Sequence, residues 1–475
     1  MDPRNLSFIA NATGGELRNA SPGEIVTGLC TDSRKISHGD LFVALVGDRF
    51  DAHEFLSPDL GRRGGAFLVE SERVGNRLSG VPQILVQDSR MALGQLGARY
   101  RESFDVPVIG VTGSNGKTST KRFLGAVLGE RFKVCASPAS FNNDIGVPLS
   151  LLQLDEGMDV AVFEIGTNHP GEIEPLARMV APQIGVLTSI GRSHLEFFGS
   201  VEAVAHEKGF LGEVLSPSGV FVVNGDTPHI DEILSRVSAR VVRVGFGSEN
   251  DWVIEDHGMG KEGTEFSIHG GRFEEPTRLH LPVLGRHHLI NVGLAMAVGA
   301  ELGLTCEELV AGVAQCRPER MRFEWGVFGG VTLFDDSYNA NTDSVTAALR
   351  TLKAFPTDGE RYAVLGEMGE LGEFSASAHE EIGRIAAECE IDRIVAVGPW
   401  ADSVCKAARD HGATSTIAIS DEEAVDVYLE GRLQSGDSLL VKASRSAGLD
   451  RLADRLRTRL NEEGTVAKAS SCLAS

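Results

Sequence analysis

The chain has 475 residues, 42% of them hydrophobic and 24% charged, so it is long enough for about three domains with cores of their own. This composition excludes a disordered or collagen-like chain, and no apolar stretch approaches the roughly 20 residues of a membrane helix. The formal net charge of −22 makes nucleic acid and anionic membranes poor partners. The N-terminal segment lacks a signal-peptide pattern, and the widely spaced cysteines form no CxxC pair, so we expect a cytoplasmic protein with reduced thiols.

The first segment mixes short strands with turns. Buried strands are predicted at 41–45, 65–70 and 83–87, and apolar residues at helical spacing predict a connecting helix over 88–101. We therefore expect a first, small mixed α/β domain over residues 1–87.

Strand and helix then alternate, which predicts a central domain over 88–316 built on a doubly wound parallel sheet. A glycine-rich, polar segment at 241–283 is expected to form a small antiparallel excursion. The other predicted strands of this domain are 105–113, 158–166, 184–190 and 219–226, and its predicted helices are 117–130, 172–180, 200–213, 287–302 and 305–315.

The alternation restarts near residue 318 and predicts a third domain over 317–475, a Rossmann-like, doubly wound α/β unit. A charged helix over 449–461 is expected to follow its last strand. The predicted strands are 331–336, 362–368, 393–398, 416–420 and 438–443.

The clearest chemical signal is GVTGSNGKTST (110–120), which lies between a buried strand and a helix. Glycines let backbone N–H groups approach phosphates, and the helix N-terminus adds positive potential. In such a loop Lys117 neutralises phosphate charge and the Thr118 hydroxyl binds Mg²⁺. The strict phosphate-loop pattern has glycine where this chain has Val111. The loop predicts nucleotide binding by Gly113, Ser114, Asn115, Gly116, Lys117, Thr118 and Ser119.

The spelling TGSNGKT resembles the Mur ligase family of ATP-dependent amide-bond-forming enzymes. Further motifs follow the loop in that family's order: SFNNDIGVPLSLL (140–152), FEIGTNHPGEI (163–173), SIGRSHLEFFGS (189–200), HEKG (206–209), GRHHLINV (285–292) and DDSYNAN (335–341). The N-terminal segment TDSRKISHGDLFVALVGDRFDAHEF (31–55) resembles the family's UDP-sugar domain, so the resemblance covers nearly the whole chain. Within the family, three segments are most similar to the member that adds D-alanyl-D-alanine to UDP-N-acetylmuramoyl-tripeptide: DDSYNAN, GTNHPGEI and VLGEMGELG (364–372). The Asp-Asn-Pro-Arg motif of the diaminopimelate-adding relative is absent.

A metal site is expected beside the phosphate loop. Glu164 ends a buried strand, at the sheet edge where ligands of open α/β sheets bind, and its carboxylate suits Mg²⁺. The resemblance implies that Thr118, Glu164, His194 and Lys208 together hold two Mg²⁺ ions and that Lys208 is carbamylated. Taken alone, His194 is more typical of a structural histidine, and Lys208 of a solvated helix lysine.

The resemblance also implies substrate contacts. Asn291, Asp336, Tyr338 and Arg320 are expected to bind ATP. Ser33 and Arg34 are expected near the UDP group, and the other substrate contacts are Asn142, Asn143, Asn168, His169 and Asn339. Ordinary turns remain an alternative interpretation at 32–34, 142–143 and 168–169.

Three departures from the family's usual motifs stand in the chain. NANT (339–342) replaces NANP, and Glu319 precedes Arg320 in place of glycine. KASR (442–445) replaces KGSR, which leaves contacts by Lys442 and Arg445 open.

The function implied by the resemblance is ATP-dependent addition of D-alanyl-D-alanine to UDP-N-acetylmuramoyl-tripeptide through an acyl phosphate. The expected cofactors are ATP and two Mg²⁺ ions, and we expect a monomer that binds neither nucleic acid nor membrane. Two alternatives remain: another amide ligase of the superfamily, either one that adds an amino acid to UDP-MurNAc-dipeptide or one of the folylpolyglutamate type, and a phosphate-loop kinase.

Overall fold

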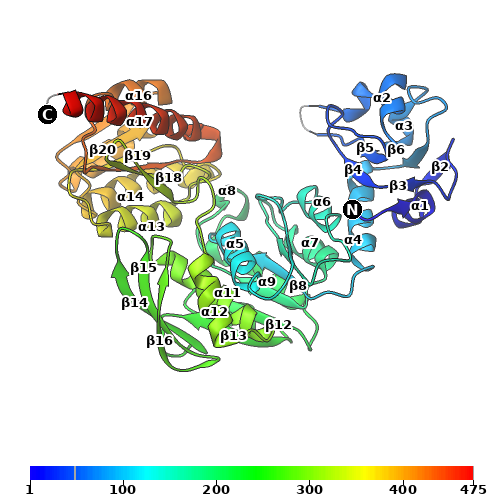
Figure 1. Cartoon of the computed structure of the whole chain (residues 1–475), viewed down its shortest axis with the longest axis horizontal. Helices are drawn as coiled ribbons and strands as arrows, with labels where there is room; N and C mark the ends of the chain where they lie inside the picture. Colours follow the sequence, from blue (N-terminus) through cyan, green and yellow to red (C-terminus); the bar gives the residue numbers. More distant parts are fainter. Residues whose placement is uncertain (48–49, 474–475) are drawn as a thin grey trace.

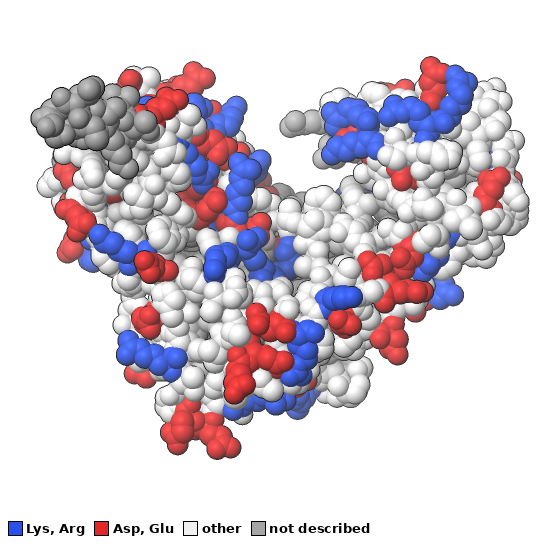
Figure 2. Space-filling model, in the orientation of Figure 1, with Lys and Arg blue, Asp and Glu red and all other residues white. Residues whose placement is uncertain are grey.

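The computed structural model describes residues 1–47 and 50–473, with side chains described as far as Glu462. Three α/β units follow one another along the chain, each around a sheet of its own (Figure 1). The N-terminal and C-terminal units stand on opposite sides of the central unit, and the molecule is hollowed between them (Figure 2). Among the described helices, none is long and apolar enough to cross a membrane.

The first unit is built on a five-stranded sheet in the order β2-β7-β6-β5-β4, parallel except where β2 meets β7. Its strands are β2 (Glu16–Arg18), β4 (Gly28–Cys30), β5 (Asp40–Val43), β6 (Ala66–Glu70) and β7 (Gln83–Val86). The last three confirm the predicted strands. Around them lie the strand pair β1 (Arg4–Asn5) and β3 (Ile25–Val26) and the helices α1 (Leu6–Thr13), η1 (Ala52–Phe55), α2 (Pro58–Arg63) and α3 (Ser71–Val74).

Helix α4 (Ser89–Arg101) joins the first unit to the central one. Its Tyr100 is fully buried, and the Tyr100 hydroxyl accepts a hydrogen bond from the Asp2 backbone N–H at 2.7 Å and donates one to the Leu154 carbonyl at 2.6 Å. Leu93 of the same helix lies in one continuous apolar core that includes residues of the first sheet and of the central unit. The first two units therefore share a core.

The central sheet has nine strands in the order β16-β15-β14-β13-β12-β11-β8-β10-β9. Strand order reverses at β8, which lies between β10 and β11, and open α/β sheets bind ligands in the crevice at such a point. The strands are β8 (Val108–Thr112), β9 (Val134–Ala136), β10 (Val160–Glu164), β11 (Ile184–Leu187), β12 (Val220–Asn224), β13 (Arg240–Gly245), β14 (Trp252–Met259), β15 (Thr264–Gly270) and β16 (Phe273–Leu281).

The predicted antiparallel excursion at 241–283 is only partly antiparallel. Strand β13 pairs in parallel with β12 and with β14, so it continues the doubly wound sheet. Only β14, β15 and β16 pair antiparallel, and they extend the same sheet. Residue patterning indicates that a segment is a strand but not the direction of its neighbours, which explains the difference.

Helices cover both faces of the central sheet. On one face α5, α11 and α12 pack together over one apolar core, and on the other α4, α6, α7 and α9 pack over the core shared with the first unit. The helices are α5 (Lys117–Leu128), α6 (Gly146–Leu151), α7 (Ile173–Val180), α8 (Leu195–Phe198), α9 (Val201–Glu213), α10 (Ile230–Leu234), α11 (His287–Glu301) and α12 (Cys306–Gln315).

The third unit has a six-stranded sheet in the order β17-β18-β22-β19-β20-β21, parallel except at β17. Its strands are β17 (Glu324–Phe328), β18 (Val331–Asp336), β19 (Arg361–Leu365), β20 (Arg393–Val397), β21 (Thr416–Ile419) and β22 (Ser438–Lys442). Helices α13 (Thr342–Ala354), α14 (Ser375–Glu388) and α15 (Ala401–Asp410) cover one face, and α16 (Glu422–Leu429) and α17 (Leu449–Leu473) cover the other. Helix α17 thus extends beyond the predicted end near Asn461.

The six described cysteines are all free. Cys472 lies outside the described side chains.

Candidate active site

The phosphate loop follows β8 and leads directly into α5, as predicted. Gly116 has φ +84°, and a Cβ there would lie 2.5 Å from Asn291 Oδ1, so the position requires glycine on both counts. The loop therefore brings its backbone N–H groups and the start of α5 to the crevice beside β8, where a phosphate group can bind.

The Lys117 side chain is directed back over this loop. Its ammonium donates a hydrogen bond to the Gly113 carbonyl at 2.8 Å. Burial lowers the pKa of Lys117, while the nearby Glu164 carboxylate opposes this change. A cation held over the loop suits the binding of a polyphosphate.

Glu164, at the carboxyl end of β10, has an exposed fraction of only 1%. Its Oε2 accepts a hydrogen bond from the Thr118 hydroxyl at 3.0 Å, and its Oε1 accepts one from Asn142 Nδ2 at 2.7 Å. Lys121 Nζ lies 3.4 Å from Oε2. A hydroxyl and a carboxylate in contact offer the hard oxygen donors that Mg²⁺ prefers, so this pair fits the metal that the sequence predicts.

His194 and Lys208, the other two predicted metal ligands, lie in different surroundings. His194 has φ +54° and lines the same pocket as Glu164, and its Nδ1 lies 2.5 Å from Glu370 Oε2 of the third unit. Lys208 is fully buried in α9, and among the described residues its ammonium has no hydrogen-bond partner. Burial, aided by the charge of Lys117, lowers the pKa of Lys208 well below its usual value.

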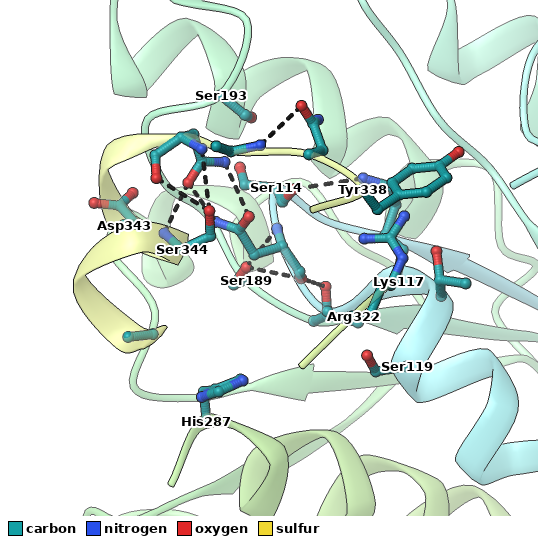
Figure 3. A pocket seen from close by; sticks show the side chains of 18 of the residues that line it. Ser114, Lys117, Ser119, Ser189, Ser193, His287, Arg322, Tyr338, Asp343 and Ser344 are labelled. Atoms are coloured by element: carbon teal, nitrogen blue, oxygen red, sulfur yellow. Dashed lines mark hydrogen bonds between the residues drawn. The ribbon is translucent and has the colours of Figure 1, made fainter. Parts of the chain in front are cut away.

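One cavity of about 480 Å³ lies between the central and third units (Figure 3), a volume typical of small-molecule sites. Many of the predicted site residues line it: Ser114, Asn115, Gly116, Lys117, Thr118, Ser119, Asn142, Glu164, Asn168, His194, Asn291, Asp336, Tyr338 and Asn339. The cavity thus unites the phosphate loop, the Glu164 carboxylate and the segment after β18.

The third unit contributes one wall of this cavity. Asp336, the last residue of β18, accepts a hydrogen bond from the Lys442 ammonium at 2.6 Å. The Lys442 ammonium also donates to the Asn339 carbonyl at 3.1 Å, so this lysine, left open by the sequence, lines the cavity. The Arg322 guanidinium lies 4.1 Å from the centre of the Tyr338 ring, and Figure 3 shows both beside Lys117.

Family models match most of the chain. A model described as the Mur ligase middle domain matches residues 111–299, and one described as the Mur ligase, glutamate ligase domain matches residues 319–445. The chain belongs to the Mur ligase family. As a Mur ligase it is an ATP-dependent enzyme that forms amide bonds, which confirms the prediction from the motifs.

Similar proteins match this Mur ligase over almost its whole length. Two of them are named UDP-N-acetylmuramoyl-tripeptide–D-alanyl-D-alanine ligase. The one from Bacillus subtilis is 32% identical over 96% of this chain and 99% of its own. The one from Escherichia coli is 34% identical over 97% of this chain and 99% of its own.

Solved structures agree with this assignment. Crystal structure I of MurF from Acinetobacter baumannii has a TM-score of 0.88 and 30% identity, covering 96% of this chain and 99% of that one. The MurF ligase from Thermotoga maritima, solved in complex with ADP, has a TM-score of 0.81 and 29% identity, covering 91% and 98%. The predicted mixed α/β fold with parallel-rich sheets is therefore confirmed.

Several predicted site residues of this Mur ligase lie outside the cavity lining. Asn143 accepts a hydrogen bond from the Gly146 N–H at 2.8 Å at the start of α6, as the turn interpretation expects. The exposed Arg320 lies 3.2 Å from Asp454, and Arg34, also exposed, pairs with Asp32 at 2.8 Å. The others outside the lining are Ser33, Gly113, His169 and Lys208.

The structure also identifies residues near the site that the sequence analysis did not single out. Asn341 of the third unit exchanges amide contacts with Asn115 of the phosphate loop, at 2.9 and 3.4 Å. Arg322 Nη2 donates to the Ser140 hydroxyl at 3.3 Å, and Lys121 approaches Glu164. Two of them had a usable signal, because Lys121 lies one helical turn after Lys117 in GKTSTK and Asn341 ends the DDSYNAN motif.

Proposed function

We propose that this Mur ligase joins D-alanyl-D-alanine to UDP-N-acetylmuramoyl-tripeptide, using ATP, to form the UDP-MurNAc-pentapeptide precursor of peptidoglycan. The main support is the near-full-length similarity to ligases that carry this name. Further support comes from the cavity, which combines a phosphate loop with a buried carboxylate and polar residues of a second unit.

ATP is proposed to bind between the central and third units. Segment 113–119 receives the phosphates, and Lys117 neutralises part of their charge. Asn291 and Tyr338 are assigned to the adenine and Asp336 to the ribose, and all three line the cavity. Arg320 is assigned to the γ-phosphate, which it would reach only when the third unit closes, since here it pairs with Asp454.

Two Mg²⁺ ions are proposed beside the phosphates. Thr118 and Glu164, already in contact, would hold one, and His194 would help to hold the second. When bound, the metal supplies positive charge that orients the phosphates and offsets the charge developing on them.

Lys208 is proposed to carry a carbamate. The unprotonated amine forms a bond to the carbon of CO₂ and releases a proton, and a low pKa favours that form of the amine. The carbamate would replace a buried ammonium without a partner by an anion with two oxygen donors. A carbamate signal in the ¹³C spectrum after incubation with ¹³C-bicarbonate, absent in Lys208→Ala, is expected. A wild-type spectrum without that signal contradicts the carbamate.

The reaction is proposed to run in two steps. The carboxylate that ends the tripeptide attacks the γ-phosphorus of ATP, and ADP leaves, which gives an acyl phosphate. The amine of D-alanyl-D-alanine then attacks the acyl carbon, phosphate leaves and the amine loses a proton. Phosphoryl transfer depends mainly on positioning and charge stabilisation. Because water hydrolyses an acyl phosphate, closure of the third unit would protect this intermediate by excluding water.

The domains are proposed to divide the substrates among them. Residues 1–87 hold the UDP group with help from Ser33 and Arg34, residues 88–316 hold ATP, and residues 317–475 close on ATP and bind the dipeptide. Contacts to the peptide substrates are assigned to Asn142, Asn143, Asn168, His169 and Asn339. We also propose that the enzyme acts as a monomer in the cytoplasm, where ATP and UDP-linked precursors are present.

The decisive experiment measures ADP release by the purified full chain with UDP-MurNAc-tripeptide, with and without D-alanyl-D-alanine. Dependence on both substrates is expected, and hydroxylamine added without the dipeptide should trap a hydroxamate from the acyl phosphate. ADP release that depends on another amine donor, on UDP-MurNAc-dipeptide or on a folate instead supports a different amide ligase. Phosphate transfer to a hydroxyl without hydroxamate supports a kinase.

A further inference from the structure

Lys121 is a buried cation for which the proposed reaction has no role. It lies on α5, one turn after Lys117, and has an exposed fraction of 5%. Its ammonium donates a hydrogen bond to the Ala139 carbonyl and lies 3.4 Å from Glu164 Oε2. A buried lysine of this kind is costly unless it is paired, so its two partners define its position.

Lys121 and Thr118 contact the same carboxylate oxygen of Glu164, and Thr118 and Glu164 are both proposed metal ligands. Glu164 Oε2 accepts the Thr118 hydroxyl at 3.0 Å and faces the Lys121 ammonium, while Oε1 is held by Asn142 at 2.7 Å. The ammonium therefore lies beside the carboxylate oxygen that Glu164 would offer to a divalent cation.

Lys121 also helps to hold the segment that carries Asn142. Its bond to the Ala139 carbonyl ties this segment to α5, and Ser140 accepts a hydrogen bond from Arg322 at 3.3 Å. Glu164 is thus oriented from two sides, directly by the ammonium and indirectly through Asn142.

The positive charges around Glu164 favour the binding of a metal together with phosphate over the binding of the metal alone. Lys117 and Arg322 lie close enough to affect one another electrostatically, and Arg322 and Glu164 both act on Lys121. A free divalent cation at Glu164 is repelled by these positive charges, and this repulsion is several times stronger inside a protein than in water. Polyphosphate brings the negative charge that offsets them, so nucleotide and metal should strengthen each other's binding reciprocally.

We propose that Lys121 is a positioning residue that holds Glu164 as an ion pair and makes the binding of the divalent metal depend on bound nucleotide. The inference rests on the proposed function, in which Glu164 is a metal ligand. It assigns Lys121 no contact with the reacting atoms.

The test compares Mn²⁺ binding to the full-length wild type and to Lys121→Met, measured by electron paramagnetic resonance without nucleotide and then with ADP. Without nucleotide, Lys121→Met should bind Mn²⁺ about tenfold more tightly, because one nearby cation is removed. The strengthening of Mn²⁺ binding by ADP should fall by a similar factor. Equal or weaker Mn²⁺ binding by Lys121→Met without nucleotide overturns the proposal.

Further variants separate charge from folding. Lys121→Arg keeps the charge and should retain the wild-type dependence on ADP, whereas Lys121→Gln should resemble Lys121→Met, which provides a second neutral variant if the first is unstable. Lys133→Met, which changes an exposed lysine at the edge of β9, should leave Mn²⁺ binding unchanged. An effect of Lys133→Met equal to that of Lys121→Met also overturns the proposal.

The two proposals fail in different ways. If the wild type forms no pentapeptide, the proposed function is wrong whatever Lys121 does. If the wild type forms pentapeptide but Lys121→Met keeps its ADP-dependent Mn²⁺ binding, only the role of Lys121 is wrong.

Discussion

At the scale of single residues, the site depends on buried polar groups whose partners come from distant parts of the chain. Glu164 is the clearest example, because Thr118 and Lys121 contact it from α5 and Asn142 contacts it from the segment between β9 and α6. Its carboxyl group lies in an almost fully buried position, where electrostatic interactions are stronger than in water. A change at this residue should therefore affect the reaction more than it affects the fold.

Glu164→Gln keeps the shape of the side chain and removes its charge. We expect kcat to fall by about 10² to 10³, the usual effect of removing one preorganised electrostatic group. ADP release at saturating Mg²⁺ measures it. The same substitution at the partly exposed Glu174 of α7 is the control and should have no effect. A Glu164→Gln enzyme with wild-type kcat contradicts the proposed role.

At the scale of elements, the strands and helices that carry the phosphate loop and Glu164 could be predicted, because buried strands and amphipathic helices leave clear patterns. Strand β17 was not predicted, since it lies at a sheet edge with few buried side chains. The Asn115–Asn341 contact could not be read from the sequence, because it joins residues 226 positions apart. Lys442 is a similar case, since its burial beside Asp336 depends on the pairing of β22 with β18.

The start of α11 makes stability depend on pH. Burial lowers the pKa of His287 from 6.5 to about 4. Between these pH values the unfolded chain binds a proton that the folded protein does not, so this contribution to stability is present above pH 6.5 and is lost as the pH falls towards 4. His287→Gln should make unfolding by denaturant less dependent on pH in this window. The same substitution at the exposed His411 should leave this pH dependence unchanged. An equal pH dependence of the unfolding free energy in the wild type, His287→Gln and His411→Gln contradicts the prediction.

Helix α4 supports a second prediction at this scale. Tyr100→Phe leaves the Asp2 N–H and the Leu154 carbonyl without their shared partner. The free energy of unfolding should fall by about 1 to 3 kcal/mol, the cost of leaving buried polar groups unpaired. Urea unfolding monitored by circular dichroism measures it, with the half-buried Tyr428→Phe as control. No loss of stability in Tyr100→Phe contradicts the role of this hydroxyl.

At the scale of the whole molecule, the two junctions between units differ in kind. The first and central units share one apolar core through α4. Polar contacts are prominent between the central and third units, above all at Arg192, which binds Asp343 at 2.7 Å and Glu381 at 2.7 Å. His194 with Glu370 and Asn115 with Asn341 add to this junction.

Arg192→Ala should loosen the third unit relative to the central one. We expect a larger radius of gyration by small-angle X-ray scattering and a KM for ATP several times higher, with a smaller effect on the KM for the UDP-linked substrate. Asp343→Asn should act in the same direction. Arg178→Ala, which removes an exposed ion pair on α7, is the control and should change neither value. An unchanged scattering profile for Arg192→Ala contradicts the prediction.

The shared core of the first two units has a consequence for the order of events in one catalytic cycle. Apolar surfaces resist separation in water, whereas ion pairs and amide contacts exchange readily with solvent. A large substrate bound to the N-terminal unit would therefore keep its position relative to the phosphate loop from one turnover to the next. Movement of the C-terminal unit alone would open and close the cavity, so nucleotide exchange would leave the bound substrate in place.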